Sequence, residues 1–123
     1  MTLDETVPSS LQTISYDPMG DGVTLTTKPL KQEMEVTGPM AAKLYVSSES
    51  IDADLFLVVR AFYPDLKEVV FKGALDPHTP IAQGWLRASH RKLDESLTPP
   101  DRPYHTHDEN QPLNPRENNE HDI

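Results

Sequence analysis

Short stretches in which apolar and polar side chains alternate with a period of two dominate the middle of the chain, a pattern typical of β-strands. In residues 42–47 (AKLYVS), for example, Leu44 and Val46 share one face. Residues 55–63 carry apolar side chains on both faces, which predicts a central strand covered on both sides. Strands are predicted over residues 23–27, 31–36, 42–47, 55–63, 68–72 and 83–89.

These elements predict an all-β fold. No stretch shows a convincing helical stripe, and short strands separated by turn signals indicate a sandwich or a jelly roll of antiparallel strands. An eight-stranded jelly roll needs at least two strands more than the six predicted, and residues 94–123 offer no candidate. We therefore expect only part of such a fold.

The chain divides into three predicted regions. Residues 1–22 form an extended linker segment that ends in a turn, residues 23–93 a partial β jelly roll, and residues 94–123 a proline-rich polar loop or tail. The last region has eight acidic and two basic side chains but only four apolar ones. We expect that it cannot support a core of its own.

Composition limits the partners and the compartment. The chain has 11 basic and 20 acidic side chains, a net charge of −9, which argues against nucleic-acid binding. It has no cysteine, so disulfides and thiolate zinc sites are excluded. The N-terminus lacks the features of a signal peptide, and the longest apolar run, residues 55–59, is far shorter than the roughly 20 residues of a membrane span. We expect a soluble protein without membrane contact, cytoplasmic by default.

Motifs of nucleophilic and nucleotide chemistry are missing. None of the five glycines begins a G-x-S-x-G motif or a phosphate-binding loop. Ser89 and His90 are neighbours on a predicted strand, so their side chains point to opposite faces and cannot act as a nucleophile and its base. The sequence therefore assigns no catalytic residue and no cofactor.

Two groups of residues have spacings that suit a metal ion, and for both we favour a structural interpretation. His105 and His107 would place two imidazoles on one face of a strand, as zinc, copper or nickel requires, but no rigid third ligand is at hand. Asp52 and Asp54 offer carboxylate oxygens for calcium. The alternative is that Asp52 satisfies turn amides and Asp54 pairs with a buried arginine. No metal ligand is assigned.

The strand over residues 83–89 and its continuation hold two further candidates. Arg87 and Arg91 could bind a carboxylate or phosphate group of a ligand, or they could pair internally with the two aspartates. Trp85, Tyr45 and Tyr63 could form a platform for sugar stacking, although single aromatic residues on strands are usually core or interface residues.

Five motifs in a fixed order resemble one known domain. They are TKPL (27–30), EVTGP (35–39), LYVSS (44–48), DADL (52–55) and GWLRASHR (84–91). PYHTH (103–107) and QPLNPRE (111–117) fit the same domain, so the resemblance covers residues 15–117. The sequence resembles the C-terminal domain of the X-Pro dipeptidyl-peptidase, cocaine esterase (CocE/NonD) and α-amino-acid ester hydrolase family of serine hydrolases.

The resemblance implies a galactose-binding-like β jelly roll that packs against an α/β-hydrolase domain and helps to wall its active-site cleft. It also implies that the chain is inactive alone, because the family's Ser-His-Asp triad lies in the hydrolase domain. That domain is the expected partner, and open strand edges would also allow a homo-oligomer.

The sequence departs from the family at two points. The family usually has Pro-Gly-Glu where this chain has Pro115, Arg116 and Glu117, and it continues into further apolar strands where this chain reaches Ile123. We therefore expect a partial domain that lacks the hydrolase before it and its own C-terminal strands. Two alternative functions stay open: a stand-alone module that binds a carbohydrate-like ligand near Trp85, and a metal-dependent module around His105 and His107.

Overall fold

The computed structural model describes residues 13–108 and 110–123, and the chain forms two compact units, Met1–Met34 and Glu35–Ile123. In the described part of the first unit, a turn follows Asp17, whose carbonyl accepts a hydrogen bond from the Gly20 amide (2.9 Å) and whose Oδ1 accepts one from the Met19 amide (2.9 Å). The predicted turn is thereby confirmed. Residues 1–12 of the predicted linker lie outside the described residues.

The predictions of strands over residues 23–27 and 31–36 are wrong, because both stretches are irregular. An alternating sequence becomes a strand only where another strand supplies hydrogen-bond partners and covers one face. Here Leu25 of the first stretch is 76 % exposed and Val36 of the second is 61 % exposed. The apolar side chains of these two stretches are therefore not buried against another strand.

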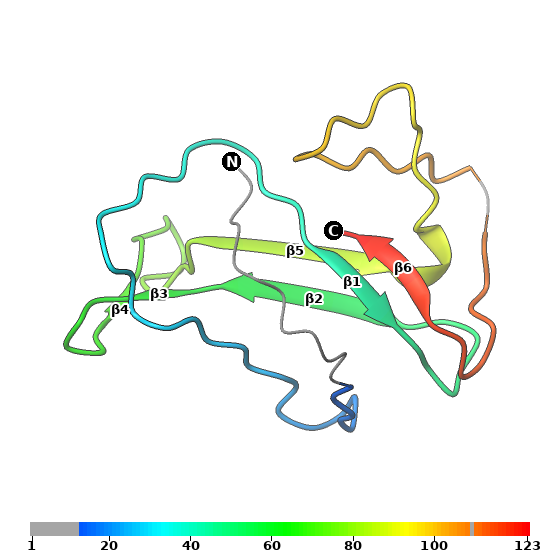
Figure 1. Ribbon diagram of the computed structural model, residues 1–123, viewed down its shortest axis with the longest axis horizontal. Helices are drawn as coiled ribbons and strands as arrows, with labels where there is room; N and C mark the ends of the chain where they lie inside the picture. The colour runs from blue at the N-terminus through cyan, green and yellow to red at the C-terminus, as the bar shows by residue number, and fades with distance from the viewer. Residues whose placement is uncertain (1–12, 109) are drawn as a thin grey trace. The chain divides into compact units, whose positions relative to one another are not determined.

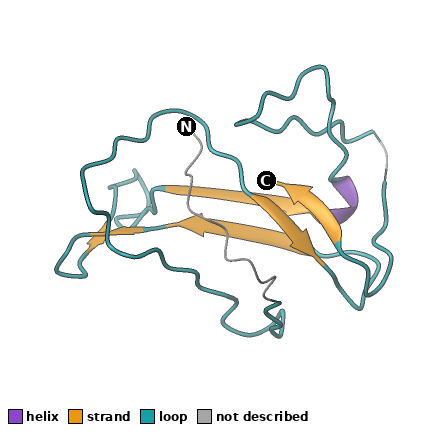
Figure 2. Cartoon of the chain, viewed as in Figure 1, coloured by secondary structure: helices purple, strands orange, loops and turns teal. Residues whose placement is uncertain are grey.

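The strands described in the second unit form three antiparallel pairs, which confirms the predicted all-β class and is consistent with a fragment of a β-sandwich (Figure 1). The pairs are β1–β6, β2–β5 and β3–β4. Figure 2 shows how much of the chain between them is loop. The strand bounds are β1 Lys43–Val46, β2 Asp54–Val59, β3 Ala61–Phe62, β4 Glu68–Val69, β5 Ala82–Arg87 and β6 Asn119–Asp122.

The longest ladder joins β2 to β5, with Leu55 opposite Leu86 and Leu57 opposite Gly84. These residues share one side of the pair, the inner face, where Leu55 is 8 % and Leu86 5 % exposed. A side chain at Gly84 would stand 3.3 Å from Cγ2 of Ile123, which directly follows β6. The inner face of β2–β5 is thus the side that the end of β6 approaches.

Strand β6 corrects the prediction that residues 94–123 offer no strand. It pairs with β1 in the register Leu44 opposite His121, and the ladder continues where Ala42 and Ile123 exchange two hydrogen bonds (2.7 and 2.9 Å). The sequence NEHD is polar and carries no strand signal of its own. Its conformation follows from pairing with a strand whose own alternation is clear.

The prediction of a central strand over residues 55–63, covered on both faces, is also wrong. The stretch is divided at Arg60 into β2 and β3, and β3 pairs with β4. On β2 only one face is buried, because Phe56 is 75 % and Val58 54 % exposed. The prediction of a strand over residues 68–72 is confirmed only for Glu68–Val69.

The polar region after residue 93 is tied to the strands through its backbone. Amides of this region donate to carbonyls near β1, β2 and β5: Gln111 to Ser89, Leu113 to Ile51 and Arg116 to Ser48, each at 2.7 Å. Leu113 is 2 % exposed, so this region contributes to the core. The three-part division at residues 22 and 93 stays a prediction. No helix among the described residues is long and apolar enough to cross a membrane.

Candidate functional site

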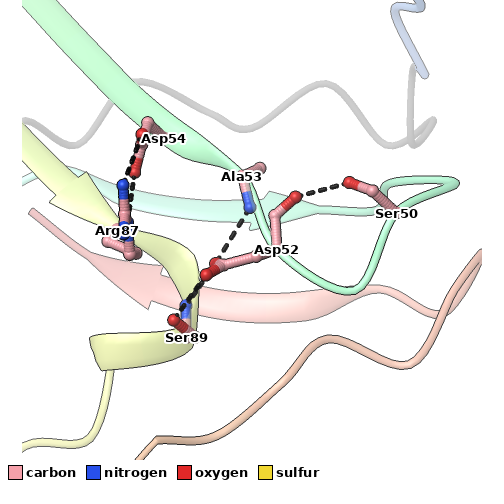
Figure 3. A network of polar contacts seen from close by, with 6 residues as sticks. All are labelled: Ser50, Asp52, Ala53, Asp54, Arg87 and Ser89. Carbon is pink, nitrogen blue, oxygen red and sulfur yellow. Dashed lines mark hydrogen bonds and ion pairs between the residues drawn. The ribbon is translucent and has the colours of Figure 1, made fainter.

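The candidate residues of the sequence meet where β2 begins and β5 ends. The β2–β5 ladder continues past its last pair through the Ala88 amide, which donates to the Ala53 carbonyl (2.8 Å). After β5 the chain turns into a short 3-10 helix, η1, over Ala88–His90. This geometry brings Asp54, the first residue of β2, opposite Arg87, the last residue of β5, and Asp52, which precedes β2, next to Ser89 of η1 (Figure 3).

Asp52 acts as a cap for η1 from the neighbouring strand. Its Oδ1 accepts hydrogen bonds from the Ser89 amide (2.9 Å) and the Ala53 amide (3.0 Å), and its Oδ2 accepts one from the Ser89 hydroxyl (2.7 Å). Burial alone raises the pKa of Asp52, but the bonds from Ser89 and Ala53 outweigh this effect and hold the pKa below its ordinary value. The carboxylate satisfies an amide of the first turn that has no partner within η1.

Asp54 forms a bidentate ion pair with Arg87 across the ladder. Arg87 donates from Nε to Oδ1 (2.8 Å) and from Nη2 to Oδ2 (3.0 Å). These hydrogen bonds hold the pKa of Asp54 below and that of Arg87 above the ordinary values. The predicted internal pairing is confirmed, but the arginine is not buried, because its side chain is 58 % exposed.

Both aspartates therefore have the internal partners that the structural interpretation predicts. The four polar atoms that Asp52 and Asp54 present are all accepting hydrogen bonds from Ala53, Ser89 or Arg87. The structure gives this cluster the role of joining two strands and the first turn of η1.

Arg91 has a role that the sequence did not indicate. Its guanidinium donates to the carbonyl of Ala88 (3.0 Å), to the carbonyl of Gln111 and to Oδ1 of Asn119 (3.4 Å). Arg91 thus fastens the last loop and the start of β6 to η1. Arg87 is paired with Asp54, whereas the hydrogen bonds of Arg91 go to uncharged oxygen atoms.

The rings of three histidines, His90, His105 and His107, lie close together. The ring of His107 lies 5.8 Å from that of His105 and 5.9 Å from that of His90, measured between centroids. His105 is also hydrogen-bonded through Nε2 to the carbonyl of Asp122 (2.9 Å). Within residues 13–108 and 110–123, no three histidine or acidic side chains are arranged to hold a metal ion. Ser89 and His90, predicted to be neighbours on a strand, lie instead in η1, and the Ser89 hydroxyl donates to Asp52 (2.7 Å).

A fourth histidine, His121, was not singled out by the sequence and is 1 % exposed. Its Nδ1 is bonded to the carbonyl of Asn119 (2.9 Å), and its Nε2 is buried without a partner among the described residues. Burial lowers the pKa of His121, and a neighbouring positive charge on Arg91 lowers it further. The residue is a neutral part of the core.

The aromatic residues lie differently from the predicted platform. Trp85 is opposite Phe56 in the β2–β5 register, whereas Tyr45 belongs to β1 and Tyr63 follows β3. Tyr45 donates its hydroxyl to Glu120 of β6 (2.8 Å). Trp85 and Phe56 could have been matched from the sequence only with the register known, since their strands are more than 20 residues apart.

Together these positions define one surface, called here the outer face: the residues of β2 and β5 on the side opposite Leu55 and Leu86. Trp85 and Phe56 are 70 % and 75 % exposed on it. Residues of both strands line a shallow pocket there. The outer face consists of Asp54, Phe56, Val58, Gln83, Trp85 and Arg87.

Comparisons with known proteins agree with the geometry. The X-Pro dipeptidyl-peptidase C-terminal non-catalytic domain family matches residues 2–119. No curated protein matches the chain. Two crystal structures of a CocE/NonD family hydrolase from Staphylococcus aureus are similar to it. One has a TM-score of 0.65 and 34 % identity over 68 % of this chain, the other 0.58 and 26 % over 72 %.

The chain spans 16 % and 18 % of those two hydrolase chains, so it is similar to a small part of a much larger enzyme. The match over residues 2–119 includes all the motifs that carried the resemblance in the sequence. This chain belongs to the family of X-Pro dipeptidyl-peptidase C-terminal non-catalytic domains.

Proposed function

We propose that the chain serves as a non-catalytic domain of a CocE/NonD-type serine hydrolase. In this role it packs against an α/β-hydrolase catalytic domain, helps to wall the active-site cleft and has no hydrolytic activity alone. The observation that carries the proposal is the family match over residues 2–119, because the family is defined as non-catalytic.

The residues of the chain support this role. The sequence has no G-x-S-x-G motif, and Asp54 and Arg87 are engaged with each other across the β2–β5 ladder. Ser89, the serine nearest to a histidine in the sequence, donates to Asp52, and that carboxylate also accepts backbone amides. A carboxylate and hydroxyl used in this way stabilise the fold and supply no nucleophile.

The proposal is tested by reconstitution with a related hydrolase. The S. aureus CocE/NonD hydrolase would be shortened at the start of the region similar to this chain, and its hydrolysis of p-nitrophenyl esters and of an X-Pro p-nitroanilide measured with and without the added chain. We expect the chain alone to give no turnover. Added to the shortened enzyme, it should raise the melting temperature, as a ligand of the folded state does, and lower KM.

Turnover by the chain alone would contradict the non-catalytic role. A melting temperature and kinetic constants that do not change at a saturating excess of the chain would contradict the role as a partner of the catalytic domain. A rise in melting temperature with an unchanged KM would leave the packing role and remove the part of the proposal that concerns the cleft.

A further inference from the structure

Within the second unit, the outer face of β2–β5 is an apolar surface that no described strand covers. Its centre is formed by Phe56, Trp85 and Val58, which are 75 %, 70 % and 54 % exposed. The first two are cross-strand neighbours, so their apolar area is contiguous. Exposed aromatic side chains that gather in this way are typical of a surface that binds something.

The geometry of a β-sandwich indicates that further strands of the sandwich would not cover this face. The inner face of β2–β5 already carries the buried Leu55 and Leu86, and the end of β6 approaches it at Gly84. Additional strands of a sandwich join a sheet at its edges by hydrogen bonds or extend the opposing sheet. Neither position lies over the outer face.

The charges on the outer face indicate which class of molecule it can bind. Asp54 and Arg87 neutralise each other in a bidentate pair, so the face carries no net charge although the chain carries −9. Both carboxylate oxygens of Asp54 and two of the five N–H groups of Arg87 are used in this pair, so the pair offers a sugar fewer polar atoms than two separate side chains would. An aromatic centre with a neutral polar margin is the usual composition of a protein–protein interface.

We propose that the outer face is the surface through which this domain docks onto the catalytic domain of the hydrolase. This inference rests on the proposed function and adds the location of the contact. The solved relatives support the choice of occupant, because the part similar to this chain is 16 % and 18 % of hydrolase chains that are mostly another structure. The catalytic domain would present an apolar depression that receives Trp85 and Phe56.

The experiment measures the affinity of the whole 123-residue chain for the shortened S. aureus hydrolase by isothermal titration calorimetry. Two variants alter the outer face: Phe56→Ser removes an aromatic anchor, and Val58→Lys places a charge in the apolar centre. The matched control is Tyr45→Ser, because Tyr45 is 67 % exposed on β1, in the other strand pair. Circular dichroism melts show which variants keep the fold.

We expect both outer-face variants to weaken binding at least tenfold, as truncation of an aromatic anchor does, and Tyr45→Ser to weaken it less than twofold. Binding that is equal for all variants would overturn the docking surface while leaving the proposed function intact. No binding of the unaltered chain would overturn both. Sedimentation that shows a dimer dispersed by Phe56→Ser, or a sugar that binds saturably at Trp85, would overturn the inference in favour of a second copy or a carbohydrate.

Discussion

The two faces of the β2–β5 pair differ although the same two strands form them. The inner face presents Leu55 and Leu86, which are almost completely buried, and the outer face presents Phe56 and Trp85, which are mostly exposed. Both faces are apolar, so hydrophobicity alone does not tell which one the fold uses. The inner face holds the domain together, and the outer face is available to a partner.

The largest effect is expected on the inner face. Replacing Leu55 or Leu86 by Ala removes a buried side chain from a small core and should lower the free energy of unfolding by about 2–5 kcal/mol. Val58→Ala on the same strand as Leu55, but on the outer face, should change it by about 0.5 kcal/mol or less. Urea titrations followed by circular dichroism measure the free energy of unfolding of each variant. Equal losses for the inner-face and outer-face variants would contradict the claim that only the inner face stabilises the domain.

The two aspartates offer a second contrast. Asp52→Ala leaves the Ser89 hydroxyl and two amides without their acceptor, which should cost about 1–3 kcal/mol and be nearly independent of salt. Asp54→Ala breaks an exposed ion pair, and we expect a smaller loss that disappears in 1 M NaCl. The reverse order in the same urea titrations would contradict the role of Asp52 as the cap of η1.

The pH dependence of stability should show two steps. Burial lowers the pKa of His121 and His105 below the ordinary 6.5, so as pH falls through that value the unfolded chain takes up protons that the folded chain does not, and stability is lost. The pKa values of Asp52 and Asp54 lie below the ordinary 3.8, so their stabilisation is present above that pH and is lost as pH falls through their lower folded values.

The first step is assigned by the His121→Leu variant. Urea titrations at pH values from 8 to 3 should give a shallower slope between pH 7 and 5.5 for this variant, while the loss at acidic pH is unchanged. A slope between pH 7 and 5.5 that is the same in both proteins would show that His121 is not buried in its neutral form.

The smallest effect on stability is expected on the outer face. Val58→Lys should leave the free energy of unfolding of the isolated chain within about 0.5 kcal/mol, and Phe56→Ser within about 1 kcal/mol, because both side chains are mostly exposed. A much larger loss in urea titrations would mean that the outer face stabilises the domain itself and would remove the reason for assigning it to a partner.

The sequence predicted the strands in which alternation coincides with pairing, and it failed where one occurs without the other. The predicted strand over residues 42–47 contains β1, and that over residues 83–89 contains most of β5, although Ala88 and Ser89 belong to η1. Residues 23–27 alternate equally well and have no partner strand among the described residues. Strand β6 has a partner but no alternation of apolar residues, so no local pattern marks it. Local pattern is a weak guide where long-range pairing decides the conformation.

The sequence predicted that charged residues of the candidate site would pair with each other, but it did not predict most of the contacts that they make. The proximity of Asp54 and Arg87 to apolar strands indicated internal pairing, and the structure confirms it. The contacts of Arg91 go to backbone carbonyls and to Asn119, which no residue pattern marks. The outer face depends on the register that sets Phe56 opposite Trp85, and one sequence does not specify a register between distant strands.

Trp85 allows the central claim to be measured directly, because it is the single tryptophan of the chain and lies on the outer face. The chain would be labelled with 5-fluorotryptophan, and its one ¹⁹F resonance recorded before and after addition of the unlabelled, shortened S. aureus hydrolase. If the domain docks through the outer face, the resonance shifts saturably and loses its sensitivity to the H₂O/D₂O ratio. A complex in which the resonance keeps its position and its solvent sensitivity would contradict docking through this face.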